Sequence, residues 1–248
     1  MNIDIRTFGT LGSTNTEALE RARGGAPEGL CIVARRQTAG RGRYGRTWVS
    51  EKDAGLYFSI ILRPKIETQF LPLITLMSGV AVHDMLAEYG VKPDIKWVND
   101  ILVDEKKIAG ILAETAETRD GIAVVVGVGV NLTEGNFPAD LANTAASIES
   151  TTGLTVSPDE AAATLAKYLS HFYPLVTEPA SVIDKWRTRS TYFSGKPVRV
   201  TTGTETITGT TDGLEPNGAL RLKREDGTVT VLQTGDVERL RTESVLEY

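Results

Sequence analysis

The chain has 248 residues, of which 41% are hydrophobic and 24% are charged, a balance typical of a globular protein with one large domain, or one domain and a small appendage. A net charge of −5 excludes the broad basic surface of a general nucleic-acid-binding protein. Because no apolar run is long enough to span a bilayer and the N-terminus has no signal-peptide pattern, we expect a cytoplasmic protein with no membrane attachment.

A helix is predicted close to the N-terminus. It begins at the sequence GSTN (residues 12–15), where Thr14 and Glu17 fit a capping box. The pair Gly24–Gly25 is typical of a C-terminal stop.

Two buried strands are predicted next, over residues 29–35 and 55–63. The first contains the only cysteine, Cys31, which we expect to be an ordinary core residue. Residues 36–54 between them have almost no apolar periodicity and many glycines. Since a loop of this length in a compact domain is either functional or disordered, this segment is a candidate for function.

The middle of the chain mixes helices with strands. An apolar helix is predicted over residues 70–90. The segment DIKWVNDILVDEKKIAGILAET predicts a short strand and then two antiparallel strands around a turn near Asp104–Glu105. Residues 121–132 indicate another buried strand, and helices are predicted near 158–176 and 180–190.

The composition changes after about residue 190. Short Thr- and Val-rich runs alternate with predicted turns at Asp212–Gly213, Asn217–Gly218 and Asp226–Gly227. Five short strands of this kind predict a small β-barrel. We therefore predict an α+β domain with a mixed sheet over residues 1–190 and a small C-terminal barrel over residues 191–248.

The loop contains a G-x-G-x-x-G spacing within TAGRGRYGRTW (residues 38–48). A dinucleotide-binding fingerprint would open a helix and be followed about 20 residues later by an acidic residue. Neither condition holds, because no helix pattern follows Gly45 and the residue twenty positions further on is Lys65. A Walker phosphate loop is excluded too, since the chain has no G-K-[ST] sequence.

The remaining interpretation is a glycine loop that holds another anion. Arg41, Arg43 and Arg46 offer planar donors suited to carboxylate and phosphate, and Trp48 offers a flat face for a base. A solvated basic loop and an ordinary core tryptophan are the alternatives.

A second polar cluster follows in KWVND (residues 96–100) and KKIAGILAE (residues 106–114). Lys107 can neutralise a phosphate, and the following glycine permits close approach of a ligand. Asp100 and Glu114 could help to hold Mg²⁺ or could be ordinary solvated carboxylates. GVGVN (residues 127–131) ends a strand in an asparagine able to contact a purine, although its glycines could equally serve packing.

Together these motifs resemble the biotin–protein ligase family. The matching sequences, in order, are GSTN (12–15), QTAGRGRYGRTW (37–48), KWVND (96–100), KIAGILAE (107–114) and GVGVN (127–131). The resemblance implies a catalytic domain of the class II synthetase and biotin ligase kind, with helices on one side of a mixed sheet. One departure is Val98, where the family usually has proline. Because only eleven residues precede GSTN, the resemblance is to the monofunctional type, and we expect no DNA-binding domain and no DNA partner.

The resemblance implies that ATP and biotin are substrates, used with Mg²⁺. It assigns catalysis to Lys107 and Arg43 and names no protein metal ligand. The biotin site implied by the family comprises Ser13, Thr14, Asn15, Gln37, Gly40, Arg41, Gly42, Arg43, Lys107, Gly110 and Leu112. The ATP site implied by the family comprises Arg43, Arg46, Trp48, Lys96, Asn99, Gly127 and Asn131. Helix capping is the alternative role for Ser13 and Thr14.

The partner implied is the biotin carboxyl carrier domain of a biotin-dependent carboxylase, whose lysine accepts the biotin. A homodimer formed sheet to sheet is one state that the resemblance allows. A lipoate–protein ligase and a non-catalytic nucleotide- or vitamin-binding module are the two rival interpretations, and the arginine-rich loop favours biotin over lipoate.

Overall fold

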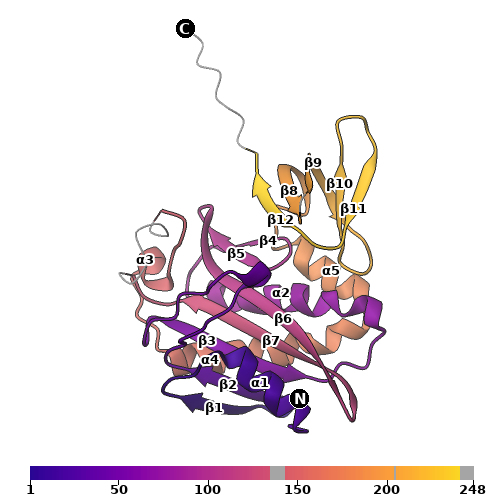
Figure 1. Ribbon diagram of the computed structural model, residues 1–248. Coiled ribbons are helices and arrows are strands. Elements are labelled where there is room, and N and C mark those ends of the chain that lie inside the picture. Colours follow the sequence, from indigo (N-terminus) through magenta and orange to yellow (C-terminus); the bar gives the residue numbers. More distant parts are fainter. Residues whose placement is uncertain (135–142, 204, 241–248) are drawn as a thin grey trace.

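The computed structural model describes residues 1–134, 143–203 and 205–240 of the chain. A seven-stranded sheet carries the helices, and a five-stranded sheet built from the C-terminal residues lies beside it (Figure 1). The predicted α+β class with a mixed sheet is confirmed.

The larger sheet has the strand order β1-β2-β3-β7-β6-β5-β4. β1 and β2 are parallel, and the other neighbours are antiparallel. The strands are β1 (Asp4–Phe8), β2 (Leu30–Ala34), β3 (Gly55–Leu62), β4 (Asp94–Lys96), β5 (Asp100–Val103), β6 (Lys106–Thr118) and β7 (Gly121–Asn131). The turn predicted at Asp104–Glu105 joins β5 to β6, and both residues have the positive φ angles, 48° and 63°, that tight hairpin turns require.

Helices cover both faces of this sheet, unequally. The helices are α1 (Thr14–Arg23), α2 (Pro72–Glu88), α3 (Ile148–Thr152), α4 (Pro158–Phe172) and α5 (Pro179–Arg187). The main core lies between the sheet and α2 and α4, and it includes the alternate β7 residues Val124, Val126 and Val128. The β7 residues Ala123 and Val125, which alternate with these, face the other way and pack beneath α1 in a smaller core. The predicted helices on one side are therefore present, and α1 occupies the opposite face.

The start of α1 differs from the prediction. Ser13 holds the N-cap position, with no side-chain cap hydrogen bond, and Glu17 forms an ion pair with Arg21. The capping box predicted from Thr14 and Glu17 is wrong, because the Thr14 hydroxyl bonds to Gln37 in the loop. The predicted C-terminal stop at Gly24 is confirmed.

The apolar α2 is the central helix of the main core. The helical stretch Thr68–Glu88 has the length and composition of a membrane span, which corrects the expectation that no such run exists. Its apolar window is 61% buried within the protein, between the sheet on one side and α4 and α5 on the other. Burial on several sides explains why the helix is apolar all round.

The C-terminal sheet has the strand order β11-β10-β9-β8-β12 and is antiparallel throughout. Its strands are β8 (Ser194–Thr202), β9 (Glu205–Leu214), β10 (Leu220–Lys223), β11 (Val229–Leu232) and β12 (Asp236–Arg239). The five predicted strands are confirmed, but Asp212–Gly213 lies inside β9 instead of forming a turn. The domain boundary at residue 190 stays a prediction, and residues 241–248 lie outside the described part of the chain.

Candidate active site

A cavity of about 500 Å³ lies on the α1 face of the large sheet. Its wall is formed by the N-terminus of α1, the glycine loop (residues 40–48), strands β5 to β7, and β12 of the C-terminal sheet. Every residue of the implied biotin and ATP sites lines this cavity except Gly40. Gly40 lies directly behind the wall, where a Cβ atom would come within 2.4 Å of the Trp48 carbonyl oxygen.

Glycines form the floor of the cavity. Gly110 on β6 and Gly129 on β7 are register partners, and the indole of Trp48 lies over both. A Cβ at Gly129 would come within 2.4 Å of Trp48 Cε2, and one at Gly127 within 2.1 Å of Asn15 Oδ1. These distances are shorter than any side chain tolerates, so the glycines of β7 are required for the loop and α1 to approach the sheet.

Trp48 carries a hydrogen-bond donor that has no partner. Its indole Nε1 is buried, and it is one of two such buried side-chain atoms among the described residues, the other being Trp186 Nε1. The Lys107 ammonium lies 5.5 Å from the centre of the Trp48 ring. A buried donor without an acceptor costs free energy.

A buried hydrogen-bond network joins the start of α1 to the loop. The Thr14 backbone N–H and hydroxyl donate to Gln37 Oε1 over 2.8 and 3.1 Å. Ser59, fully buried on β3, lies 2.8 Å from the Thr14 hydroxyl and 2.6 Å from Asn15 Oδ1. Ser59 was not predicted as a site residue, because nothing in its strand pattern sets it apart from a packing position.

Both ends of this network reach the glycine loop. On one side Gln37 Nε2 donates to Ser50, whose hydroxyl donates to the Trp48 carbonyl. On the other side the Asn15 amide donates to Glu114, and Glu114 accepts from Arg41 over 2.8 Å. A ligand held at the start of α1 is thereby linked to both ends of the loop.

Two lysines share one carboxylate at the opposite wall. Asp100 Oδ1 lies 2.6 Å from Lys107 Nζ, and Asp100 Oδ2 lies 3.1 Å from Lys96 Nζ. Burial alone would raise the pKa of Asp100, but the charges of Lys107 and Lys96 outweigh burial and hold the pKa below its usual value. Asp100 is therefore ionised at neutral pH and keeps both ammonium groups at the cavity wall.

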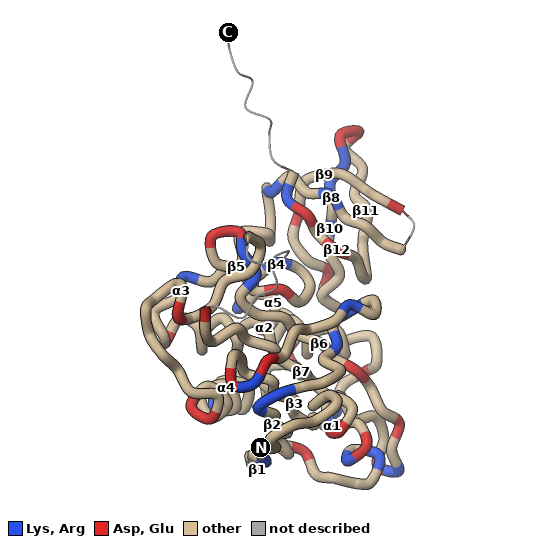
Figure 2. The backbone as a smooth tube through the Cα atoms, turned by 60° about the vertical axis from the view of Figure 1, so that its left-hand side comes forward, with Lys and Arg blue, Asp and Glu red and all other residues tan. Residues whose placement is uncertain are grey.

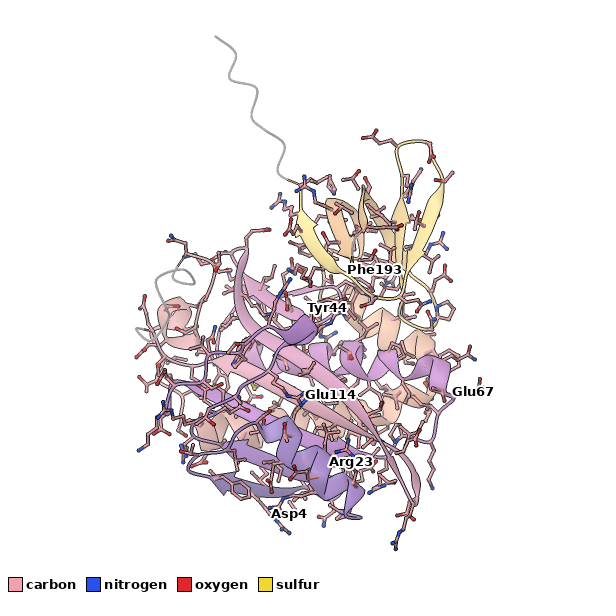
Figure 3. The ribbon with its side chains drawn as sticks, in the orientation of Figure 1. Asp4, Arg23, Tyr44, Glu67, Glu114 and Phe193 are labelled. Atoms are coloured by element: carbon pink, nitrogen blue, oxygen red, sulfur yellow. The ribbon has the colours of Figure 1, made fainter. Side chains whose placement is uncertain are left out.

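The tip of the glycine loop touches the C-terminal sheet. Arg43 donates to Asn99 Oδ1 on one side, and to the Thr234 hydroxyl and the Gly235 carbonyl on the other. Arg46 forms an ion pair with Asp236 at the start of β12. Figure 3 shows Tyr44, at the loop tip, on the side nearest the C-terminal sheet, and Glu114 further along β6.

The cavity lining combines cationic and acidic side chains. The five cationic side chains predicted for the site are Arg41, Arg43, Arg46, Lys96 and Lys107, and their carboxylate partners are Glu114, Asp236 and Asp100. Lys and Arg positions are otherwise interspersed with Asp and Glu positions along the chain (Figure 2). Arg239 and three further carboxylates, Glu51, Glu105 and Glu238, also line the cavity, so the positive charge near a ligand comes from where the five predicted cations lie and not from a large excess of cations.

Asn131 has contacts that differ from the predicted purine contact. Its amide nitrogen donates to the carbonyls of Ala146, over 2.9 Å, and Lys107, over 3.4 Å. The backbone of Lys107 is fixed further, because its N–H donates to the Thr144 carbonyl. Asn131 therefore supports the segment that carries Lys107, and its role toward ATP stays a prediction.

The chain matches known families over most of its length. Residues 9–131 match the biotin/lipoate A/B protein ligase family, and residues 193–240 match the biotin protein ligase C-terminal domain. It is 34% identical to the bifunctional ligase/repressor BirA of Bacillus spizizenii, over 92% of this chain and 71% of that protein. It is 32% identical to the biotin–[acetyl-CoA-carboxylase] ligase of Paracoccus denitrificans, over 87% of this chain and 92% of that protein.

A solved structure is similar over nearly the whole chain. The biotin protein ligase of Aquifex aeolicus, determined in complex with biotin and ATP, has a TM-score of 0.82 and 28% sequence identity. The match covers 96% of this chain and 99% of that protein. Both sheets therefore have a counterpart in that structure.

Proposed function

Because the chain belongs to the biotin protein ligase family, we propose that it activates biotin with ATP and transfers it to a lysine of a biotin carboxyl carrier domain. A biotin carboxylate oxygen attacks the α-phosphorus, the bond to the β-phosphate breaks, and pyrophosphate leaves. The acceptor amine then attacks the carbonyl of biotinyl-5′-AMP, and AMP leaves as the C–O bond breaks. The proposal corresponds to a biotin–[acetyl-CoA-carboxylase] ligase, which is the name of the Paracoccus denitrificans relative.

The observation that carries this proposal is the single cavity in which a polar cradle, a flat glycine floor and a set of cations meet. The cradle of Ser13, Thr14 and Gln37 would hold the polar ring of biotin. The wall at Gly110 and Leu112 would take its apolar tail. A carboxylate at the end of that tail would then lie near Lys107, which is positioned by Asp100.

Catalysis in this proposal is positioning and charge stabilisation, without a protein nucleophile. Lys107 and Arg43 would offset the negative charge that builds up between carboxylate and α-phosphate. Arg46 would contact the pyrophosphate end, and Trp48 would stack on adenine.

The described residues suit a magnesium ion that arrives with ATP. They include no group of three His, Cys, Asp or Glu side chains placed to hold a metal. The two carboxylates considered as ligands are already engaged, Asp100 by two lysines and Glu114 by Asn15 and Arg41. Since Mg²⁺ readily takes phosphate oxygens and water, we treat MgATP as the substrate.

One assay distinguishes the biotin ligase from a lipoate ligase and from a non-catalytic binding module. The family model spans biotin and lipoate ligases alike, and the C-terminal match and the named relatives favour biotin. We expect the purified protein to catalyse ATP–pyrophosphate exchange that depends on biotin and not on lipoate. Exchange with lipoate alone would support the lipoate ligase, and absence of exchange with either vitamin would support a binding module.

A further inference from the structure

The C-terminal sheet supplies a clamp for Arg43, which we define as Thr234 and Gly235, the two residues that precede β12. Arg43 donates to the Thr234 hydroxyl over 2.7 Å and to the Gly235 carbonyl over 3.2 Å. Tyr44 adds to the same contact, because its hydroxyl lies 2.7 Å from the Thr234 hydroxyl and 3.0 Å from Arg43 NH2. The clamp lies more than 180 residues away along the chain from the loop that it contacts.

The clamp fixes Arg43 between the two sheets. Its NH1 also donates to Asn99 Oδ1, and Asn99 is itself fixed because its Nδ2 donates a hydrogen bond of 2.9 Å to the Ile111 carbonyl on β6. A free arginine side chain loses rotamer entropy when it binds a ligand. An arginine already fixed by both sheets has lost most of this freedom before the ligand arrives.

The clamp also leaves the charge of Arg43 available. Among the described residues, the acceptors of Arg43 are neutral hydroxyl, amide and carbonyl oxygens. The other two loop arginines each contact a carboxylate, Arg41 that of Glu114 and Arg46 that of Asp236. Arg43 is thus the loop arginine that is fixed in place without being neutralised, which is what stabilisation of a developing negative charge requires.

We propose that Thr234, in the turn before β12, is a positioning residue for adenylate formation, acting through Arg43. The inference rests on the proposed ligase function and deepens it, because it gives the C-terminal sheet a direct part in the chemistry at the large sheet. Thr234 touches Arg43 and need not touch either substrate.

The test is a double-mutant cycle in biotin-dependent ATP–pyrophosphate exchange. Thr234→Val keeps the shape of the side chain and removes the hydroxyl. Thr230→Val is the matched control, because the Thr230 hydroxyl also accepts a hydrogen bond from an arginine, Arg224, within the same sheet. Each variant is measured alone, and Thr234→Val is also combined with Arg43→Ala, with protein concentration raised to keep the slow variants measurable.

We expect Thr234→Val to lower kcat/KM about three- to tenfold, which is the scale of an ordinary hydrogen bond, because Thr234 is exposed and water competes for its contact with Arg43. Thr230→Val should match the parent protein, and Thr234→Val should cause no further loss when Arg43 is already alanine. The melting temperatures of the two threonine variants should agree, because each substitution removes one exposed hydrogen bond.

Two results overturn the inference while leaving the ligase proposal intact. In one, Thr234→Val and Thr230→Val have the same activity. In the other, Thr234→Val causes its full loss in the Arg43→Ala background as well. If the parent protein itself shows no exchange with biotin, the proposed function fails first.

Discussion

Replacing Ser59 by alanine should weaken biotin binding without a comparable effect on ATP. Ser59 is fully buried, and its hydroxyl is the donor available to Thr14 Oγ1 and Asn15 Oδ1 at 2.8 and 2.6 Å. A hydroxyl has one proton, so the substitution removes one hydrogen bond and leaves a buried acceptor unsatisfied. The expected cost is about 1–3 kcal/mol in the free energy of unfolding.

Ser78→Ala is the matched control for this change. Ser78 is also fully buried, but its hydroxyl donates over 2.7 Å to the Ile74 carbonyl one turn back in α2, far from the loop. That carbonyl keeps its helical main-chain partner when the hydroxyl is removed, and alanine favours the helix by about 0.5 kcal/mol. We therefore expect the free energy of unfolding to change by less than about 1 kcal/mol.

The decisive readout is ligand affinity, measured by titration calorimetry for biotin and by steady-state KM for ATP. If the loss of one hydrogen bond of the network shifts Thr14 and Gln37 and weakens the binding free energy of biotin by about 1.4 kcal/mol, the Kd for biotin rises about tenfold. The KM for ATP at saturating biotin should change less than twofold in Ser59→Ala, and neither constant should change in Ser78→Ala. A Ser59→Ala protein that is less stable but binds biotin like the parent would refute a positioning role for the network.

Three further predictions concern charged residues. Lys107→Ala should lower the rate of pyrophosphate exchange by about 10²–10³-fold with an unchanged circular dichroism spectrum, and near-normal exchange would remove Lys107 from the mechanism. Asp236→Ala should speed trypsin cleavage of the glycine loop in the ligand-free protein, because Arg46 loses its ion-pair partner on β12. With biotin and MgATP bound, the variant and the parent should be cleaved at the same rate. Equal cleavage rates of the two ligand-free proteins would contradict the prediction. Burial raises the pKa of Asp84, but hydrogen bonds from His83 and Arg189 outweigh burial and lower the pKa to about 2. The ionised Asp84 therefore stabilises the folded protein fully above about pH 4, and this contribution to the free energy of unfolding is lost as the pH falls through about 2. Asp84→Asn should therefore cost roughly 2 kcal/mol in urea unfolding at pH 7 and little at pH 2, and an equal cost at both values would exclude this origin.

Most of the fold was predictable because its elements carry strong local patterns. The buried strands and the apolar α2 stand out by hydrophobic runs, and the C-terminal strands by their turn residues. β1 was missed because its residues are largely exposed at the sheet edge, so it has no buried run. Asp212–Gly213 was misassigned because its turn composition is accommodated inside β9, where Gly213 has a φ angle of 86° and donates to the Phe193 carbonyl.

The site was predictable as far as its motifs extend. Loop, strand-end and helix-start sequences converge on one cavity because each carries residues that a packing role does not require. Ser59 and Thr234 lacked such a signal, since a serine in a strand and a threonine in a turn are common in any sheet. Their importance appears only when the tertiary structure brings them to Asn15 and Arg43.

The measurement that tests the ligase proposal most directly is mass spectrometry of a biotin carboxyl carrier domain after incubation with this protein, biotin and MgATP. We predict that the domain gains the mass of one biotinyl group on a single lysine, that omission of ATP or biotin abolishes the gain, and that lipoate cannot replace biotin. An unmodified carrier domain in the complete reaction, with a folded protein and an acceptor that a known ligase biotinylates in parallel, would contradict the proposed function.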